Sequence, residues 1–296
     1  MPCTDTGKTW HKLSLISGHA SRDKAFQFTS LAHLLDVEYL EDCYRSLNRN
    51  KAVGIDEVSW EDYGDNLNGN LEGLVSRLKL KKYKPIPARR VYIPKGETEM
   101  RPLGISALEN KIVERGIAWI LESIYEQDFH NCSYGFRPDR NCHQALKELN
   151  DLIMFQPINH IVEADIKGFF DHVSHERLMA FLRVRINDPS LLNLIEKFLK
   201  AGYVDDGILV KPGEGTPQGS ILSPILANVF LHYVLDEWFE ETVKNHVKGF
   251  CEIVRYADDF VCVVRYADDA ERIERAFHNR FNKYGLELNA EKTGRF

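Results

Sequence analysis

The chain has 296 residues, a formal net charge of −6 at pH 7, 44% hydrophobic residues and 28% charged residues. This composition is typical of a globular protein and excludes a disordered or low-complexity chain. No apolar run reaches the roughly 18 residues of a membrane span, and the N-terminal residues lack the pattern of a signal peptide. We therefore expect neither membrane insertion nor secretion.

The cysteines are scattered along the chain, and no two of them form a C-x-x-C pair. They are Cys3, Cys43, Cys132, Cys142, Cys251 and Cys262. We expect free thiols in a reducing cytoplasm, because neither the spacing of a zinc site nor that of a disulfide framework is present.

The N-terminal half reads as helices interrupted by a hairpin. Residues 1–30 are weakly patterned and are expected to be a loosely held extension. Hydrophobic spacing predicts helices over 31–48, 65–82, 106–127 and 140–154. The segments VYIP (91–94) and RPLGI (101–105) flank KGETEM and predict a β-hairpin.

The segment 77–101 is basic although the chain as a whole is acidic. It contains nine lysines and arginines against two glutamates, with tyrosines, prolines and glycine interspersed. The acidic net charge argues against a nucleic-acid binder, but this segment suits an extended arm that presents cations to phosphates. A solvated basic hairpin is the simpler alternative.

The C-terminal half predicts strands that alternate with helices. A buried strand is expected over 161–165, a turn at Gly168 and a helix capped by Ser174. The segment GILV reads as a short strand, and after a Gly/Pro loop a long helix is expected from about Ser220. This order predicts an α+β fold. No linker separates the halves, so two subdomains in close contact are expected.

The word RYADD occurs twice, at 255–259 and at 265–269. The first copy lies between two β-rich runs, which predicts a hairpin with Asp258 and Asp259 at its tip. The second copy precedes a helical apolar face formed by Ile273, Phe277, Phe281 and Tyr284. There, Asp268 or Asp269 is expected to cap the helix N-terminus. The flanking residues therefore indicate a metal site at the first copy only.

Asp165, at the end of the strand IVEAD, can supply a third carboxylate. Three such groups offer oxygen ligands to two hard cations, which can activate a hydroxyl and stabilise a leaving pyrophosphate. Taken singly, Asp165 could equally be a helix cap, and Asp258 and Asp259 could belong to an ordinary turn.

The chain resembles the reverse transcriptase domain of group II intron-encoded proteins, the maturase–reverse transcriptases. The resemblance spans nearly the whole sequence. It departs at Asp139 and Asn141, where the family more usually has Gly and Ser. The matching segments are NKAVGIDEVSW, YKPIPARRVYIPKGETEMRPLGI, SYGFRPDRNCHQAL, ADIKGFFDHVSH, GTPQGSILSPILANVFLHYVLD, VRYADDFVCVV and GLELNAEKT.

The resemblance implies a right-hand polymerase fold of fingers and palm, with an antiparallel palm sheet packed on helices. It implies a fingers region over 31–155 and a palm over 156–296. The thumb and later domains are expected to be absent, because the sequence ends after the fourth palm motif.

The resemblance also implies a catalytic set. Asp165, Asp258 and Asp259 would bind two Mg²⁺ ions, with Mn²⁺ as a substitute, together with the backbone carbonyl of Ile166. Lys292, in AEKT, would donate a proton to pyrophosphate.

Further residues are implied to bind the incoming nucleotide. They are Arg89, Lys95, Arg101, Phe170, Gln218 and Gly219. The basic residues would hold the triphosphate, and Gly219 would allow the backbone to approach closely. Phe170 would exclude a ribose 2′-hydroxyl; core packing is its alternative role, although Phe169 is the better core candidate.

The implied function is RNA-directed DNA synthesis, with RNA template, DNA primer and dNTPs as partners. Binding of group II intron RNA, a homodimer and a bacterial cytoplasmic location are implied as well. The alternatives are a catalytically weak RNA-binding scaffold, or a reverse transcriptase of a retron, diversity-generating or CRISPR-associated system. An RNA-dependent RNA polymerase is disfavoured by Phe170 and by Ala257 in YADD.

Overall fold

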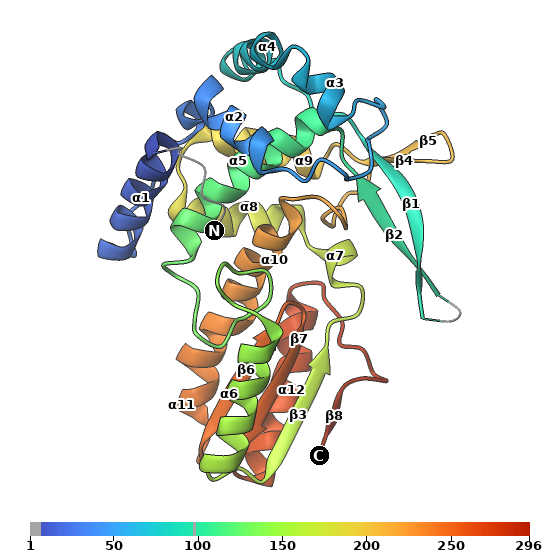
Figure 1. Cartoon of the computed structure of the whole chain (residues 1–296). Helices are drawn as coiled ribbons and strands as arrows, with labels where there is room; N and C mark the ends of the chain where they lie inside the picture. The colour runs from blue at the N-terminus through green and yellow to red at the C-terminus, as the bar shows by residue number, and fades with distance from the viewer. Residues whose placement is uncertain (1–6, 97–98) are drawn as a thin grey trace. The chain divides into compact units, whose positions relative to one another are not determined.

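The computed structural model describes residues 7–96 and 99–296, without the side chain of Lys95 (Figure 1). Cys3 lies outside this part of the chain, and the remaining cysteines are free thiols. The chain forms two compact units. The first contains the residues up to Asp128 and Leu182–Pro224, and the second contains Phe129–Phe181 and Ile225–Phe296. The functional division at residue 155 stays a prediction. Among the described helices, none is both long and apolar enough to cross a bilayer.

The helices of the first unit include several that the sequence patterns missed. They are α1 (Gly7–Arg22), η1 (Ala32–Leu34), α2 (Val37–Ser46), α3 (Trp60–Gly64), α4 (Leu67–Lys79), α5 (Leu108–Tyr125) and α9 (Pro189–Leu199). Helix α1 packs on α5, where the rings of Trp10 and Trp119 lie 5.2 Å apart and Leu13 is buried. Residues 7–22 of the N-terminal segment thus form a packed helix, not a loosely held extension.

The helix predicted over 31–48 is interrupted at Asp36. The Asp36 carboxylate accepts a hydrogen bond from the Tyr39 backbone N–H at 2.9 Å and caps α2. A residue at the N-cap has an extended backbone conformation, so the helix cannot continue through it. The earlier leucines form only the short turn of η1.

The first unit contains a sheet with the strand order β2–β1–β4–β5. These strands are β1 (Ala88–Lys95), β2 (Glu99–Ile105), β4 (Tyr203–Asp205) and β5 (Ile208–Val210). The predicted hairpin is confirmed, since β1 and β2 pair antiparallel. The parallel pairing of β1 with β4 joins Ala88 to Tyr203, which sequence patterns could not reveal.

A buried glutamate holds the loop that follows β5. Glu114, on α5, accepts hydrogen bonds from the Ser106 hydroxyl at 2.9 Å, the Ser220 hydroxyl at 3.0 Å and the Ile221 backbone N–H at 2.9 Å. Burial raises the pKa of Glu114, and these donors oppose that rise. Because a buried acceptor needs its partners, Glu114 fixes the loop against α5.

The same loop is also fixed against β2. The Gly104 N–H donates to the Gln218 carbonyl at 2.6 Å. Gly219 has φ +101°, and a Cβ there would lie 2.8 Å from the Gly104 carbonyl oxygen. Only glycine suits both this backbone conformation and this close approach.

The second unit contains an antiparallel sheet with the order β6–β7–β3–β8. The strands are β6 (Cys251–Tyr256), β7 (Asp259–Val264), β3 (His160–Asp165) and β8 (Gly294–Arg295). Strand β7 is hydrophobic from Phe260 to Val264, and most of these residues are buried. Such strands must be covered on both faces.

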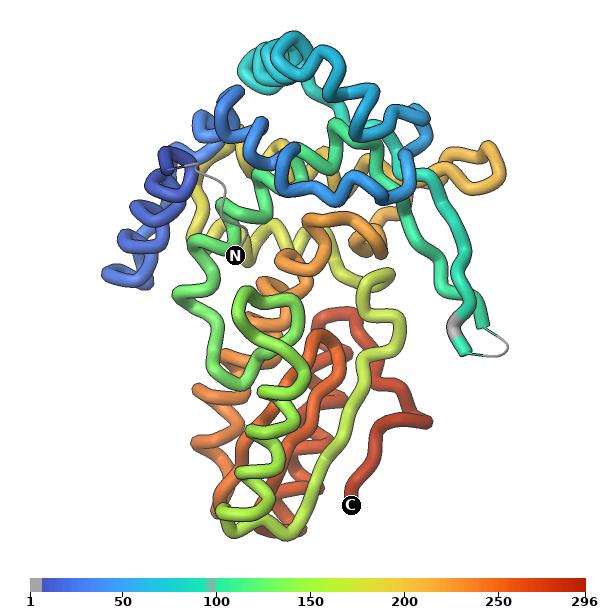
Figure 2. Tube along the Cα trace, viewed as in Figure 1, coloured from blue at the N-terminus to red at the C-terminus, as the bar shows by residue number. Residues whose placement is uncertain are grey.

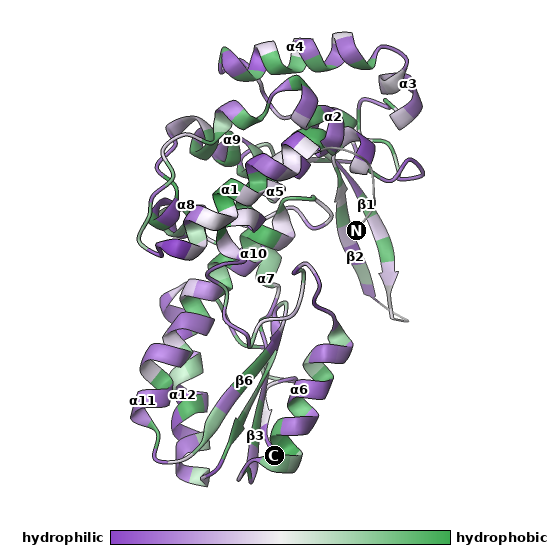
Figure 3. Cartoon of the chain, turned by 60° about the vertical axis from the view of Figure 1, so that its left-hand side comes forward, coloured by the Kyte–Doolittle hydropathy of each residue, from purple (hydrophilic) through white to green (hydrophobic). Residues whose placement is uncertain are grey.

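Helices cover both faces of this sheet. The helices of the unit are α6 (Cys142–Phe155), α7 (Phe169–His172), α8 (His175–Arg185), α10 (Ser223–Leu231), η2 (His232–Asp236), η3 (Phe239–Val243), α11 (Lys244–His246) and α12 (Ala267–Lys283); the last residues of α8 and the first two of α10 are counted with the first unit. Helix α6 packs on β6, and α12 packs on β3 and β7 from the other face (Figures 1 and 3). Phe260 of β7 contacts Phe277 and Phe281 of α12, with ring centres 5.0 and 5.7 Å apart.

Asp139 and Asn141, the two residues that differ from the usual family form, are compatible with the local backbone geometry. Asp139 has φ +57°, a conformation in which glycine is preferred and aspartate is tolerated. Asn141 caps α6 in a reciprocal pair with Gln144, at 2.8 and 3.1 Å, as a serine could.

The first RYADD word forms the predicted hairpin tip. Tyr256 and Asp259 are register partners in β6 and β7, and the two residues between them make the turn. Ala257 has φ +59° in this turn.

The second RYADD word begins α12, but the prediction that one of its aspartates caps the helix is wrong. The N-cap is Tyr266, without a side-chain hydrogen bond, and both aspartates lie inside the first turn. Asp269 is fully buried and accepts hydrogen bonds from the backbone N–H groups of Lys248 at 2.9 Å and Gly249 at 3.1 Å. Its role is to hold the loop that enters β6.

Replacement of Asp269 by alanine should destabilise the protein. The change leaves two N–H groups without their acceptor, so we expect the free energy of unfolding to fall by about 2–3 kcal/mol. Asp268→Ala is the matched control, because that side chain is 79% exposed and should change stability by less than about 0.5 kcal/mol. Urea unfolding of both variants checks this. Equal stabilities would contradict the role of Asp269.

Replacement of Gly219 by alanine should also destabilise the protein. Strain at its positive φ and the clash with Gly104 are expected to lower the free energy of unfolding by about 1–3 kcal/mol. Gly213 lies in the same loop, and a Cβ there would meet no atom within 4 Å. Gly213→Ala should therefore be neutral or slightly stabilising in thermal unfolding. A neutral Gly219→Ala would show that the loop relaxes freely.

Candidate active site

Asp165 and Asp259 lie directly opposite each other in the second unit. Asp165 ends β3 and Asp259 begins β7, and the two are register partners. Asp259 is hydrogen-bonded to the Asp165 side chain. Partial burial, this hydrogen bond and the negative charges of Asp258 and Asp165 raise the pKa of Asp259 to about 6. The strand register thus brings carboxylates together despite their mutual repulsion.

Two side chains from the segment after α12 contact Asp165. Lys292 Nζ lies 3.0 Å from Asp165 Oδ2, and Asn289 Nδ2 donates to the same oxygen at 3.2 Å. The Asn289 backbone N–H donates to the Asp165 carbonyl at 2.8 Å, and Ile166 bridges to Leu288. The hydrogen bond to Asp165 and its charge raise the pKa of Lys292, so the ammonium stays protonated beside the carboxylates.

A pocket of about 480 Å³ opens beside these groups. Its lining includes Asp165 and Asp259 from the sheet and Lys292 and Thr293 from the C-terminal segment. The pocket therefore combines carboxylate oxygens with one cation at the end of β3.

The carboxylates suit a divalent cation in their chemistry. Hard cations prefer oxygen ligands, and a cation would relieve the repulsion that raises the pKa of Asp259. Across residues 7–96 and 99–296, however, no three acidic, histidine or cysteine side chains are already arranged as a ligand set. The part of such a site that is present is the Asp165–Asp259 pair. The negative charge of Asp258 acts on both Asp259 and Lys292.

Phe170 lies on α7, a few residues after Asp165. Its ring packs edge-on against Phe169 at 5.5 Å and Phe136 at 6.3 Å. Phe169 is buried, as expected of the core residue, whereas Phe170 is half-buried. Phe170 is thus partly accessible, and its role as a gate stays a prediction.

The other predicted nucleotide-binding residues belong to the first unit. Arg89 Nη2 donates to the Val53 carbonyl at 2.9 Å, and Arg101 is exposed on β2. Gln218 and Gly219 lie in the loop held by Glu114 and Gly104. The side chain of Lys95 lies outside the described residues.

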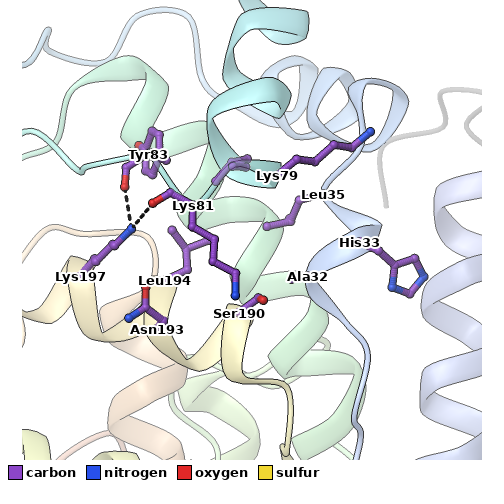
Figure 4. Close-up of a pocket in the computed structure, with 11 residues that line it drawn as sticks. Ala32, His33, Leu35, Lys79, Lys81, Tyr83, Ser190, Asn193, Leu194 and Lys197 are labelled. Carbon is purple, nitrogen blue, oxygen red and sulfur yellow. Dashed lines mark hydrogen bonds between the residues drawn. The ribbon is translucent and has the colours of Figure 1, made fainter.

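The first unit also contains a pocket of about 210 Å³ that none of the predicted site residues lines (Figure 4). Lys197, on α9, points toward its rim and donates to the carbonyls of Lys81 and Tyr83, both at 3.0 Å. This ammonium therefore orders the chain between α4 and β1.

Sequence reasoning missed Asn289 and Glu114. Asn289 lies in the recognised segment GLELNAEKT, but its partner Asp165 is 124 positions away and no local pattern joins them. Glu114 carried a usable signal, since it is a lone acid in the apolar run IVERGIAWIL. A buried acid in such a helix requires hydrogen-bond donors from elsewhere in the fold.

The family model described as "Reverse transcriptase (RNA-dependent DNA polymerase)" matches residues 93–296. The group II intron-encoded protein LtrA of Lactococcus lactis subsp. cremoris is 39% identical over 225 residues, which cover 74% of this chain and 37% of that protein. Protein YkfC of Escherichia coli (strain K12) is 36% identical over 230 residues, which cover 75% of this chain and 60% of that protein. This chain thus spans less than two thirds of either relative.

Among solved structures, telomerase from Candida albicans, in complex with a TWJ fragment of telomeric RNA, is similar in fold. The TM-score is 0.57 at 16% identity, over 80% of this chain and 46% of that chain. These similarities confirm the predicted fold class and the resemblance found in the sequence. With its paired carboxylates at the end of an antiparallel sheet, the chain belongs to the reverse transcriptase (RNA-dependent DNA polymerase) family, and its curated relatives include group II intron-encoded proteins.

Proposed function

We propose that this chain is an RNA-directed DNA polymerase that adds dNTPs to a primer 3′-hydroxyl on an RNA template. The observation that carries the proposal is the register of β3 and β7, which sets Asp165 opposite Asp259 with Asp258 in the adjoining turn. Carboxylates that face each other in a sheet lower the stability of the fold through their repulsion. Cation-assisted phosphoryl transfer requires such an arrangement, because the carboxylates bind the cations.

Asp165, Asp258 and Asp259 would hold Mg²⁺, or Mn²⁺ as a substitute, with the Ile166 carbonyl as a further ligand. Bound there, the cations would lower the pKa of the primer hydroxyl and neutralise charge on the leaving pyrophosphate. The contribution of the chain is to keep the carboxylates aligned by pairing β3 with β7.

Lys292 holds a proton on Nζ beside Asp165. Its raised pKa keeps that proton bound for as long as the negative charge of Asp165 is not neutralised. We propose that Lys292 gives this proton to the pyrophosphate once the charge of Asp165 is compensated.

The first unit would contact the incoming nucleotide. Arg89, Lys95 and Arg101 are the cations proposed for the triphosphate, and the loop of Gln218 and Gly219 would lie along the base and sugar. The firm attachment of this loop through Glu114 supports the assignment, because a nucleotide-binding backbone must keep its shape.

We further propose that the fingers lie within residues 31–155 and the palm within residues 156–296, and that the chain binds group II intron RNA. The likeness to LtrA, an intron-encoded protein by name, supports intron RNA as a partner. A homodimer and a bacterial cytoplasmic location remain part of this proposal. A scaffold without chemistry is the weaker alternative, because RNA binding alone has no need of opposed carboxylates.

Replacement of Asp258 by alanine should abolish DNA synthesis. Asp258 is a proposed ligand of the cations that would compensate charge in the transition state, so its loss is expected to lower the rate by about 10³-fold or more. Primer extension on poly(rA)/oligo(dT) with Mg²⁺ measures the rate. Asp268→Ala carries the same change in the second RYADD word and should stay within about twofold of the unchanged protein. Equal loss in both variants would refute the assignment of the active copy.

Replacement of Phe170 by alanine or valine should admit ribonucleotides. Removing the ring opens space at the sugar 2′ position, and a change of this kind in one pocket contact is worth about 10–100-fold in selectivity. The ratio of kcat/KM for dTTP and rUTP measures it. Phe155→Ala is the control, because that side chain is 76% exposed at the end of α6. Unchanged sugar selectivity in Phe170→Ala would remove the gate assignment.

A further inference from the structure

The arginine of the first RYADD word is fully buried beneath the hairpin tip. Arg255 donates to both carboxylate oxygens of Asp236, from Nε at 2.8 Å and from Nη2 at 2.5 Å. Its Nη1 donates to Asn228 Oδ1 at 3.1 Å and to the Ala257 carbonyl at 2.8 Å. Asp236 and Asn228 are themselves buried, so the guanidinium is held rigidly from two helical elements, η2 and α10.

The bond to Ala257 acts directly on the turn. Ala257 has φ +59°, a conformation that residues with a Cβ rarely adopt. Its carbonyl belongs to the peptide group that leads into Asp258. By donating to that carbonyl, Arg255 fixes the orientation of the peptide group and hence the backbone from which the Asp258 side chain extends.

A second segment of the chain closes over the same turn (Figure 2). The Arg255 backbone N–H donates to the Cys132 carbonyl at 2.8 Å, and the Tyr134 N–H donates to the Arg255 carbonyl at 2.9 Å. Asn228 Nδ2 donates to the Gly135 carbonyl at 2.9 Å. A Cβ on Gly135 would lie 2.3 Å from the Ala257 nitrogen, so its backbone rests directly on the turn. Asn228 thus links Arg255 to this segment.

The second RYADD word shows how the same residues behave without buried hydrogen-bond partners for the arginine. The Arg265 guanidinium stacks over the Tyr266 ring at 5.0 Å and is exposed. Within the described part of the chain it reaches no buried aspartate, and α12 begins two residues after it. The tertiary surroundings, not the word, therefore give Arg255 its contacts.

A purely stabilising role explains this network poorly. A buried ion pair costs much of its attraction in desolvation, and apolar residues of similar volume often stabilise a core as well. What apolar residues cannot do is donate to the Ala257 carbonyl.

We propose that Arg255, held by Asp236 and Asn228, is a positioning residue that fixes the Ala257–Asp258 turn and so pre-organises the carboxylates of Asp258 and Asp259 for a divalent cation opposite Asp165. The proposal rests on the proposed function. It assigns to Arg255 no contact with substrate or metal.

Arg255→Lys and Asn228→Ala test the proposal in the full chain. Lysine keeps the charge but loses the fork of donors, and Asn228→Ala removes one support of that fork. Three measurements are made well below each unfolding midpoint: Mn²⁺ affinity from the free-ion EPR signal, amide hydrogen exchange across residues 255–260, and kcat for primer extension.

We expect both variants to bind Mn²⁺ about 10-fold more weakly and to lose a similar factor in kcat, since residues that orient metal ligands typically contribute this much. Exchange across the turn should rise, while KM for the primer–template stays unchanged. Asp269→Asn is the matched control. This change weakens the hydrogen bonds by which Asp269 holds the loop that enters β6. It should lower the stability of the protein but leave Mn²⁺ affinity, exchange across residues 255–260 and kcat unchanged.

Unchanged Mn²⁺ affinity and unchanged exchange in a folded Arg255→Lys or Asn228→Ala variant would overturn the proposal. So would an equal effect of Asp269→Asn, which would reduce the network to general stability. If Arg255→Lys does not fold, Asn228→Ala decides alone. A failure of the proposed function would give a different result. The unchanged protein and an Asp258→Ala variant would then bind Mn²⁺ equally, whereas amide exchange would still show whether Arg255 orders the turn.

Discussion

The antiparallel register of β3 against β7 is the constraint on which the candidate site depends. It sets Asp165 opposite Asp259 and at the same time turns Ala164 and Phe260 into the core. Because side chains alternate along a strand, a slip of one residue would expose the core residues and separate the carboxylates. The packing of Phe260 on α12 therefore enforces the geometry of the site, and the same hydrophobic contacts serve stability and chemistry.

The structure holds these carboxylates together against their repulsion. Lys292 forms an ion pair with Asp165, and Asn289 donates a hydrogen bond to it. Partial burial and the neighbouring carboxylates raise the pKa of Asp259 to about 6. The arrangement costs stability, as active-site electrostatics commonly do. The segment after α12 returns along β3 and supplies both partners, so the last described strand and the site are formed by the same part of the chain.

In each unit, a buried ionisable side chain holds the loop that carries proposed functional residues. Glu114 binds the segment of Ser220 and Ile221 through its carboxylate, and Arg255 binds the Ala257 carbonyl through its guanidinium. In both cases a helix or strand provides the ionisable side chain and the loop backbone provides a hydrogen-bond partner. Since a buried polar group is costly without its hydrogen bonds, each loop is confined to a conformation that satisfies it.

The sequence by itself determined the α+β fold, the β1–β2 hairpin, the hairpin tip with Asp258 and Asp259, and the family, because hydrophobic periodicity and contiguous motifs are local. It also distinguished the two RYADD words by their flanking residues. Only the tertiary structure decided that Asp269 holds a loop and caps no helix, that Asn289 binds Asp165, and that Arg255 supports the turn. These roles are set by partners distant along the chain, and local patterns carry no information about which distant groups meet.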